Sequence, residues 1–200
     1  MRCVIQTIPE RLKFARLQAE KLGVHCDRWV DAEKKGPFLG FIDSLNFCPS
    51  GDEYRLHMQD DIIFCDDFVD YLPTLEEMMR KKEINLLSLF APRRKHMRVQ
   101  FEKGKRIGSF PNFLWMQCVI MSPLMVSRLK EHAHQYDDKH DDVYVNAVLR
   151  AYKDKAFVHL PSLVQHDIGI PSSMGHANND KRTSELFDPH FVTKWKNQQQ

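Results

Sequence analysis

Apolar and polar positions along the chain follow two periods. Short apolar runs, typical of buried or half-buried strands, fall at 2–7, 24–30, 54–59, 84–90, 116–121 and 155–160. Between them apolar residues recur at spacings of three and four, which predicts helices at 9–22, 36–48, 68–82, 122–130 and from 141 onward. This alternation predicts an α/β fold, a single Rossmann-like domain whose central, mostly parallel sheet is flanked by helices.

Capping residues support the ends of these helices. Pro9 suits the first helical position, and Gly23 suits the end of the same helix. Ser122-Pro123 offers an N-cap followed by a proline at the first position. Asp66-Asp67 precedes the helix at 68–82 in the same way, so this pair is interpreted as a structural cap and not as part of a site.

Two adjacent carboxylates, Asp60 and Asp61, end the strand predicted at 54–59. Open α/β sheets bind their ligands at the carboxyl ends of parallel strands. Paired carboxylate oxygens suit Mg²⁺ or Mn²⁺, and these ions suit a diphosphate. The alternative is that the pair only starts a turn or caps the next helix. The turn that carries Arg11 is expected at the same edge, where its guanidinium meets a phosphate or a nucleobase, or is only solvated.

A basic segment follows the strand at 84–90. Between Arg93 and Arg106 the chain has seven Lys or Arg and one Glu, an excess of +6 in a protein of formal net charge +2. Val99, Phe101 and Ile107 alternate around a Lys-Gly-Lys centre, which predicts a small β-hairpin insertion. A basic hairpin suits a polyanion such as a DNA or RNA backbone, and a solubilising surface is the alternative. The acceptor-binding candidates here are basic side chains and two aromatics that could stack on a base or sugar ring or pack in the core: Arg93, Arg94, Lys95, Arg98, Phe113 and Trp115.

Further polar groups stand late in the chain. Asp141-Asp142 opens a predicted helix, and N-capping explains only one of the two. His166 follows the last predicted strand and leads into a loop at 167–176 that is rich in small and hydroxyl residues, with Arg182 just beyond. A lone histidine at such a place is either a ligand or a structural residue.

Composition limits the class of protein. The 200 residues are 28% charged and 42% apolar, as in a globular protein of one domain. We expect this domain at 1–190 and a polar tail at 191–200. The five cysteines form no Cys-x-x-Cys pair, which argues against a zinc ribbon or disulfide framework and predicts reduced thiols in the cytoplasm. No apolar run is long enough for a signal peptide or a membrane span.

Four motifs in order carry a resemblance to a known family. They are the Thr7-x-Pro9-x-Arg11 turn, the Gln59-Asp60-Asp61 strand end, the Asp141-Asp142 helix start and the His-x-x-Gly-x-x-Ser-Ser-x-Gly loop at 166–175. Together they resemble small glycosyltransferases of the GT-A fold, over about residues 2–187. Gln59 stands where an acid is frequent in the Asp-x-Asp or Glu-Asp-Asp signature of the family.

The resemblance implies a transfer of sugar from a nucleotide-sugar donor, most often a UDP-sugar, with Mn²⁺ or Mg²⁺. Asp61 and His166 would bind the metal, with His176 as a substitute for His166. Asp60 would assist the metal or contact the ribose. Asp142, or Asp141 in its place, would act as the catalytic base of an inverting reaction, and Asp142 is preferred because Asp141 is better placed to cap. The donor would lie against the turns after the first strands and under the late loop: Thr7, Pro9, Arg11, Asp31, Ser172, Ser173, Gly175 and Lys181 or Arg182.

The acceptor is open at this level. A hydroxymethylated base in DNA or a surface-glycan intermediate fits an enzyme of bacterial or phage origin, and the basic segment favours DNA. Two other classes of function compete. One is a metal-dependent nuclease or phosphoesterase that uses the same acids, and the other is a non-catalytic nucleic-acid-binding protein that uses only the basic segment.

Overall fold

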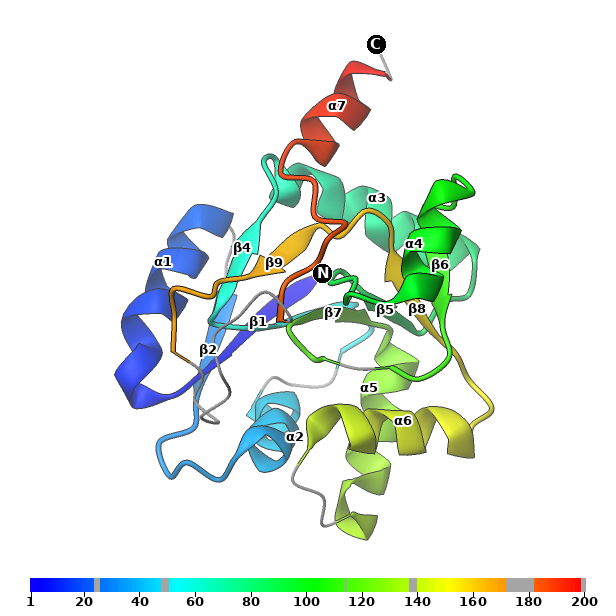
Figure 1. Ribbon diagram of the computed structural model, residues 1–200. Helices are drawn as coiled ribbons and strands as arrows, with labels where there is room; N and C mark the ends of the chain where they lie inside the picture. Colours follow the sequence, from blue (N-terminus) through cyan, green and yellow to red (C-terminus); the bar gives the residue numbers. More distant parts are fainter. Residues whose placement is uncertain (24–25, 48–50, 114, 137–139, 172–181, 199–200) are drawn as a thin grey trace.

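A seven-stranded sheet forms the centre of the molecule (Figure 1). The structure is a computed structural model and describes residues 1–23, 26–47, 51–113, 115–136, 140–171 and 182–198. The strand order is β2-β1-β3-β7-β5-β8-β6, and β7 and β6 run against the other five. The predicted α/β fold with a mostly parallel central sheet is therefore confirmed. The strands in this order are Cys26–Val30, Arg2–Thr7, Arg55–Gln59, Cys118–Met121, Leu86–Ser88, Ala156–His159 and Ile107–Phe110.

Helices cover both faces of the sheet and enclose two hydrophobic cores (Figure 1). One core packs α1, α3 and α7 against the sheet, and the other packs α2, α5 and α6. No helix in the described ranges is long and apolar enough to cross a membrane. The helices are η1 (Pro9–Arg11), α1 (Leu12–Leu22), α2 (Pro37–Phe47), α3 (Phe68–Lys81), α4 (Lys95–Glu102), α5 (Pro123–His132), η2 (Ala133–Gln135), α6 (Asp141–Ala151) and α7 (Phe191–Asn197).

Most of the predicted helix ends are confirmed. Pro9 begins the η1 turn that leads into α1, and Gly23 ends α1 in the left-handed conformation at φ 60°. The Ser122 hydroxyl accepts the N–H of Met125 and caps α5. Asp67 differs from the prediction, because it stands at the N-cap position of α3 without capping it. Its carboxylate accepts the hydroxyl of Thr193 instead, because α7 packs beside it.

A second, two-stranded sheet was not predicted. β4 (Ile62–Phe64) follows the acidic pair directly and runs antiparallel to β9 (Val164–His166). Ile62 is the register partner of His166, and the N–H of Asp167 donates to the carbonyl oxygen of Asp61 at 2.8 Å. This small sheet brings His166, distant in the sequence, to the residues that follow β3.

The predicted hairpin in the basic segment is wrong. Lys95–Glu102 forms the helix α4, and the chain then turns at Gly104, with φ 74°, into β6, which pairs with β8. Of the apolar residues that alternate, Val99 and Phe101 lie in α4, while Ile107 begins β6. Met97 and Phe101 are four residues apart and so share one face of the helix, and both pack against the core. Met97 supplies the buried contact of α4, and this fixes the helix.

Most of the segment expected as a polar tail is helical. Residues 191–197 form α7, whose Phe191 and Val192 are buried in the core beside α3. Trp195 also packs against this core, with its ring 4.8 Å from that of Tyr71. The proposed domain limit at residue 190 remains a prediction.

Candidate active site

The carboxyl ends of three neighbouring parallel strands meet at one edge of the sheet. Thr7 ends β1, Asp31 follows β2, and Asp60 follows β3. The backbone links two of them, because the N–H of Asp31 donates to the carbonyl oxygen of Thr7 at 2.8 Å. The structure therefore brings together the turn of β1 and the acidic pair, as the parallel order of the strands predicts.

Arg11 joins the two buried carboxylates. Its Nη2 lies 2.7 Å from Oδ1 of Asp60 and 2.8 Å from Oδ2 of Asp61. Arg11 is 9% exposed and each aspartate 3%. The Thr7 hydroxyl donates a hydrogen bond to Oδ2 of Asp60. Burial raises the pKa of Asp60 to about 6, although Arg11 and the Thr7 hydroxyl both act to lower it.

Asp61 faces two further groups on its other side. Its Oδ1 lies 3.6 Å from Nδ1 of His166, and its Oδ2 lies 3.9 Å from Nη2 of Arg182. Burial acts to raise the pKa of Asp61, but His166 and Arg11 outweigh it, so the pKa lies below the ordinary value. Burial also lowers the pKa of Arg182, against the opposite effect of Asp61. Asp61 is therefore a buried carboxylate held in its charged form.

Several buried polar atoms at this edge make no hydrogen bond. They include Oδ1 of Asp61, Nε of Arg11 and both ring nitrogens of His166. Buried polar atoms normally find a partner, and exceptions in a structure point to a role or to a bound group. Here a carboxylate oxygen and an imidazole nitrogen face one another without a hydrogen bond.

This pair suits a divalent cation in part. Carboxylate and imidazole are both ligands of Mn²⁺, and a separation of 3.6 Å allows both atoms to bind one ion. Among the described residues, no group of three or more His, Cys, Asp or Glu side chains is placed to hold a metal. The chain thus offers two ligands here, and the remaining positions would fall to ligand oxygens and water.

Asp31 already has backbone partners. Its two carboxylate oxygens accept the N–H groups of Lys35 at 3.0 Å and Gly36 at 3.2 Å, at the start of α2. The carboxylate therefore shapes the loop between β2 and α2, and a role in contacting the donor remains a prediction. Pro9 contributes by beginning the η1 turn that aims Arg11 at the acidic pair.

The second acidic pair lies near the same edge. Oδ2 of Asp142 accepts the N–H of Trp115 at 3.2 Å, and the segment of Trp115 runs into Gln117, whose carbonyl oxygen accepts the N–H of Gln59. Gln59 directly precedes the first acidic pair. One side-chain and one backbone hydrogen bond thus link α6 to the end of β3.

The two aspartates of this pair have different surroundings. Oδ1 of Asp141 accepts the N–H of Asp142, while its Oδ2 is buried without a hydrogen bond. Burial, with the nearby Asp142 charge, raises the pKa of Asp141 to about 7. Asp141 is thus the more buried acid, and Asp142 is the one that contacts the loop at the sheet edge.

Trp115 stands out among the acceptor candidates. It is half-buried, its φ is 78°, and its ring lies 6.0 Å from that of Phe90. A bulky residue in the left-handed region is strained, and such residues cluster at functional sites. Phe113 differs, because it is fully buried against Phe110 and cannot stack on an acceptor.

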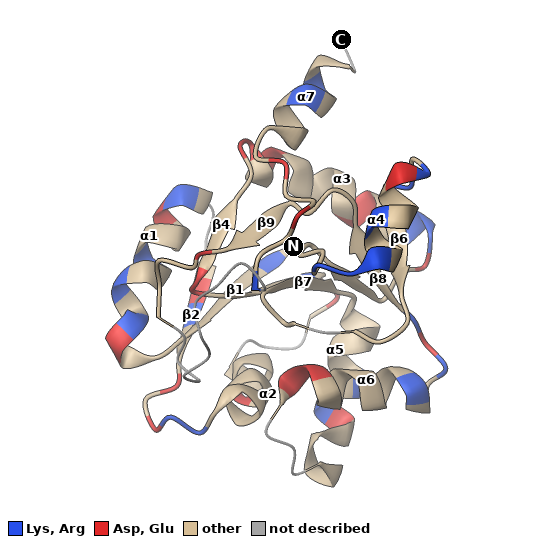
Figure 2. Cartoon of the chain, in the orientation of Figure 1, with Lys and Arg blue, Asp and Glu red and all other residues tan. Residues whose placement is uncertain are grey.

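The basic candidates line the start of α4 (Figure 2). Arg93, Arg94, Lys95 and Arg98 are all exposed. Two of them hold the segment that follows Arg182: Arg93 donates to Thr183, and Arg98 pairs with Glu185. Part of this positive charge therefore anchors a neighbouring chain segment.

Several predicted residues lie outside the described ranges. Ser172, Ser173 and Gly175, predicted to contact the donor, are among them, as are His176 and Lys181.

The sequence did not single out Gln18. Its side chain is buried and donates to the carbonyl oxygen of Ile62 at 3.0 Å, so it fixes α1 against β4 next to the acidic pair. A polar residue on the apolar face of the predicted helix at 9–22 was the available signal.

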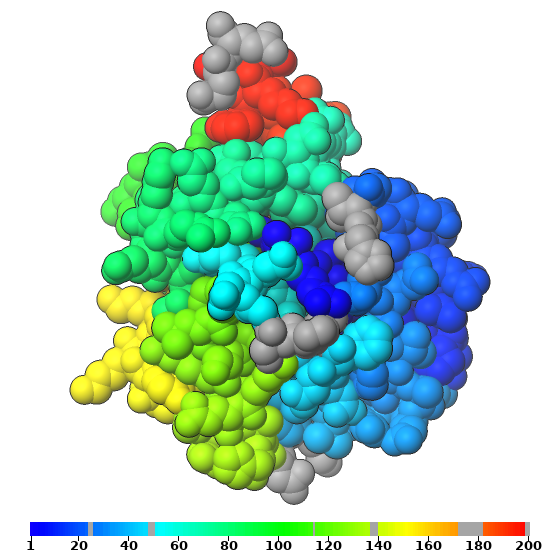
Figure 3. Space-filling model, turned by 180° about the vertical axis from the view of Figure 1, so that it is seen from behind, coloured from blue at the N-terminus to red at the C-terminus, as the bar shows by residue number. Residues whose placement is uncertain are grey.

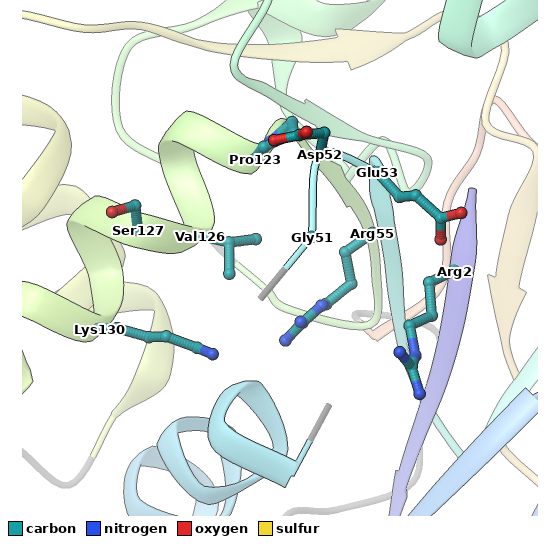
Figure 4. A pocket seen from close by; sticks show the side chains of 9 residues that line it. All are labelled: Arg2, Gly51, Asp52, Glu53, Arg55, Pro123, Val126, Ser127 and Lys130. Carbon is teal, nitrogen blue, oxygen red and sulfur yellow. The ribbon is translucent and has the colours of Figure 1, made fainter. Parts of the chain in front are cut away.

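The opposite edge of the sheet carries a pocket of about 480 Å³ (Figure 4). It lies where β1 and β3 begin, beside α5, so it is separate from the acidic pair. Figure 3 shows the molecule from behind, where the start of the chain reaches the surface near the segment that precedes β3. Arg55 at this pocket donates to the carbonyl oxygen of Leu45 at 2.8 Å and so holds the end of α2. The lining residues are Arg2, Gly51, Asp52, Glu53, Arg55, Pro123, Val126, Ser127 and Lys130.

Comparisons with known proteins relate the chain to others by shape. No protein-family model matches it, and no curated protein matches it by sequence. The crystal structure of A197 from STIV overlaps it with a TM-score of 0.54 and 12% identity, over 83% of this chain and 85% of that one. This similarity shows a shared fold.

Two further solved structures overlap it with lower scores. UDP-glucose pyrophosphorylase complexed with UDP-glucose has a TM-score of 0.42 and 9% identity, over 80% of this chain and 90% of that one. A Drosophila β-1,4-galactosyltransferase 7 mutant, complexed with manganese, UDP-Gal and xylobiose, has a TM-score of 0.43 and 9% identity, over 97% of this chain and 74% of that one.

Proposed function

We propose that the protein is a glycosyltransferase of the GT-A type, which moves a sugar from a nucleotide-sugar donor to an acceptor hydroxyl. The observation that carries this proposal is the buried Asp61, whose Oδ1 lies 3.6 Å from Nδ1 of the buried His166, with no hydrogen bond to either atom, at the carboxyl edge of a mostly parallel sheet. This edge is where open α/β sheets bind nucleotides. A UDP-sugar is the proposed donor.

The cations of the site suit the diphosphate of such a donor. Arg11 and Arg182 both lie next to Asp61, and guanidinium groups bind phosphate oxygens with paired hydrogen bonds. In the structure Asp60 and Asp61 hold the guanidinium of Arg11 in place. A diphosphate at this edge would accept hydrogen bonds from one edge of each guanidinium while the carboxylates keep the N–H groups that they already contact.

Asp61 and His166 are the proposed holders of Mn²⁺ or Mg²⁺. The ion supplies positive charge that offsets the charge on the departing nucleoside diphosphate. Thr7 and Arg11 have a separate task, because their contacts with Asp60 fix the acidic pair at the end of β3. The carboxylates are thus oriented by the protein before the donor arrives.

Asp142 is the proposed base, and Asp141 the neighbour that positions it. Asp142 contacts the Trp115 loop, which is joined through Gln117 to the end of β3. In an inverting reaction its carboxylate accepts the proton of the attacking hydroxyl.

Trp115 offers a stacking surface for the acceptor beside Asp142. The exposed cations of α4 favour an anionic acceptor, either a hydroxymethylated base in DNA or a surface-glycan intermediate. A cytoplasmic location remains a prediction.

A donor-hydrolysis assay tests the proposal. Without an acceptor, glycosyltransferases slowly hydrolyse the donor, because water takes the sugar and the nucleoside diphosphate is released. Purified protein is therefore incubated with a panel of UDP-, GDP- and dTDP-sugars in the presence of Mn²⁺, Mg²⁺ or a chelator. We expect release of one nucleoside diphosphate, lost in Asp61→Asn and unchanged in Asp67→Asn. Absence of release from every donor, together with metal-dependent cleavage of plasmid DNA, would replace the proposal with a nuclease.

A further inference from the structure

Two cysteines on neighbouring strands lie directly opposite each other. Cys3 of β1 is the register partner of Cys26 of β2, and their Sγ atoms are 2.7 Å apart. Both are free thiols. Neighbouring strands lie about 4.8 Å apart, within the Cα separation of about 4.4–6.8 Å that a disulfide bond requires. The backbone therefore already has the spacing at which these two sulfurs can bond.

The other described cysteines lack this arrangement. Cys65 and Cys118 are also buried free thiols, but neither is the register partner of a cysteine on a neighbouring strand. Burial raises the pKa of Cys65 to about 12 and also raises that of Cys118. They serve as internal controls for the pair.

The two members of the pair are not equivalent. The hydrogen bond between the thiols lowers the pKa of Cys26 and raises that of Cys3. Cys26 begins β2, the outermost strand on its side of the sheet, and it is 9% exposed against 4% for Cys3. Cys26 is therefore the more accessible sulfur, and its lowered pKa favours attack by the Cys26 thiolate.

We propose that Cys3 and Cys26 are a redox modification site, at which hydrogen peroxide forms a reversible disulfide bond. The Cys26 thiolate attacks one peroxide oxygen, the O–O bond breaks, and Cys26 becomes a sulfenic acid while the other oxygen takes a proton and leaves as water. The Cys3 sulfur then attacks the Cys26 sulfur, the S–O bond breaks, and the hydroxide leaves as water with the Cys3 proton. In total two thiols and one peroxide give one disulfide and two waters.

The bond would tie together the first β-α-β unit. It closes the loop that contains α1 and the turn of Thr7 and Arg11, and it joins the two strands whose other ends carry Thr7 and Asp31. A cross-link that restricts the unfolded chain raises the melting temperature, by about 6–12 °C for a loop and a protein of this size. The site thus links the redox state of the surroundings to the stability of the unit that carries Arg11.

Peptide mapping after oxidation tests the inference. Reduced wild-type protein is treated with one equivalent of hydrogen peroxide, remaining thiols are blocked with N-ethylmaleimide, and the protein is digested without reductant for mass spectrometry. We expect a linked peptide pair that contains Cys3 and Cys26, with a rise in melting temperature that dithiothreitol reverses. Cys26→Ser should abolish both results, and Cys65→Ser should keep both.

The outcome that overturns the inference is equally specific. The inference is wrong if Cys3 and Cys26 both carry maleimide after peroxide treatment. It is also wrong if Cys26 is oxidised to a sulfinic acid while Cys3 carries maleimide. Should Cys26→Ser fail to fold, Cys3→Ser replaces it, and the wild-type peptide map alone still decides.

Discussion

The first two Asp-Asp pairs of the chain lie in opposite surroundings. Asp60-Asp61 is buried at the end of β3, bridged by Arg11 and faced by His166. Asp66-Asp67 lies on the exposed turn before α3 and pairs with α7 and the residue before it. Oδ2 of Asp66 lies 2.7 Å from Nδ1 of His190, which directly precedes α7. The buried pair retains a carboxylate oxygen without a hydrogen bond, whereas the carboxylates of the exposed pair are satisfied by surface contacts.

This difference shows that an acidic pair is a candidate site when it is buried and when charged side chains surround it. In water two adjacent carboxylates cost little, and exposed ion pairs contribute little to stability. In the interior they are tolerated only with close positive charge and hydrogen bonds. The buried pair thus concentrates charge at the sheet edge, and the exposed pair serves as a matched control in each prediction below.

The largest expected effect is on stability. Arg11→Met leaves Asp60 and Asp61 buried without their bridging cation, and breaking a buried ion pair costs about 3–5 kcal/mol. We expect the free energy of unfolding, measured by urea titration, to fall by this amount at pH 7. Lys196→Met, which removes the cation beside Asp67, should leave the unfolding midpoint unchanged. Equal midpoints for both variants would contradict the buried bridge.

The next effect concerns pH. The folded pKa of Asp60, about 6, lies above its ordinary value of 3.8, so the folded protein binds this proton more tightly than the unfolded chain. Asp60 therefore favours folding fully below pH about 4, and this contribution of about 3 kcal/mol is lost as the pH rises through about 6. Urea titrations from pH 4.5 to 7.5 should show a decline in wild type that Asp60→Asn reduces. Asp66→Asn should retain the wild-type slope, and an identical slope in all three proteins would refute the burial effect.

Activity gives the third comparison. Asp61→Asn keeps the shape of the side chain but removes its charge beside His166, and we expect turnover of the donor to fall on the order of 100-fold, which corresponds to about 2.7 kcal/mol. Asp67→Asn should stay within twofold of wild type. Circular dichroism of both variants checks that the fold is kept. Full activity in Asp61→Asn would remove this residue from the site.

The smallest effect tests one hydrogen bond. Thr7→Val removes the hydroxyl that donates to Asp60, and loss of such a bond costs about 1 kcal/mol of unfolding free energy. The hydroxyl also acts to lower the pKa of Asp60, so its loss should move the pH-dependent decline to higher pH. Thr193→Val removes the matching donor to Asp67 and should change neither quantity. A Thr7→Val protein with the wild-type pH profile would mean that this bond does not act on Asp60.

Local pattern predicted the parts of the fold that depend on single segments. The apolar runs and the caps at Gly23 and Ser122 located strands and helices, and parallel order placed Thr7 and Asp60 at one edge. The basic segment misled because Val99, Phe101 and Ile107 alternate, whereas the helix packs through Met97 and Phe101, four residues apart. The choice between the two patterns depends on which side chains are buried, and burial depends on the rest of the chain.

Tertiary contacts decided what the sequence left open. The Arg11 bridge, the approach of His166 through β9 and the docking of Phe191 each join segments far apart in the chain. Parallel strand order predicts that Arg11 and the acidic pair share an edge, but the ion pairs themselves and the docking of Phe191 follow only from the packed structure. The same holds for the opposition of Cys3 and Cys26, which follows from the register of β1 on β2.

Calorimetric titration of UDP in the presence of Mn²⁺ tests the central claim most directly, because it measures binding at the acidic pair without knowledge of the acceptor. We predict binding to wild type, an affinity at least about tenfold weaker for Asp61→Asn, and wild-type affinity for Asp67→Asn. Equal affinity of UDP for all three proteins would contradict a donor site at Asp60 and Asp61. The same conclusion would follow if neither UDP nor any other nucleoside diphosphate bound the wild-type protein.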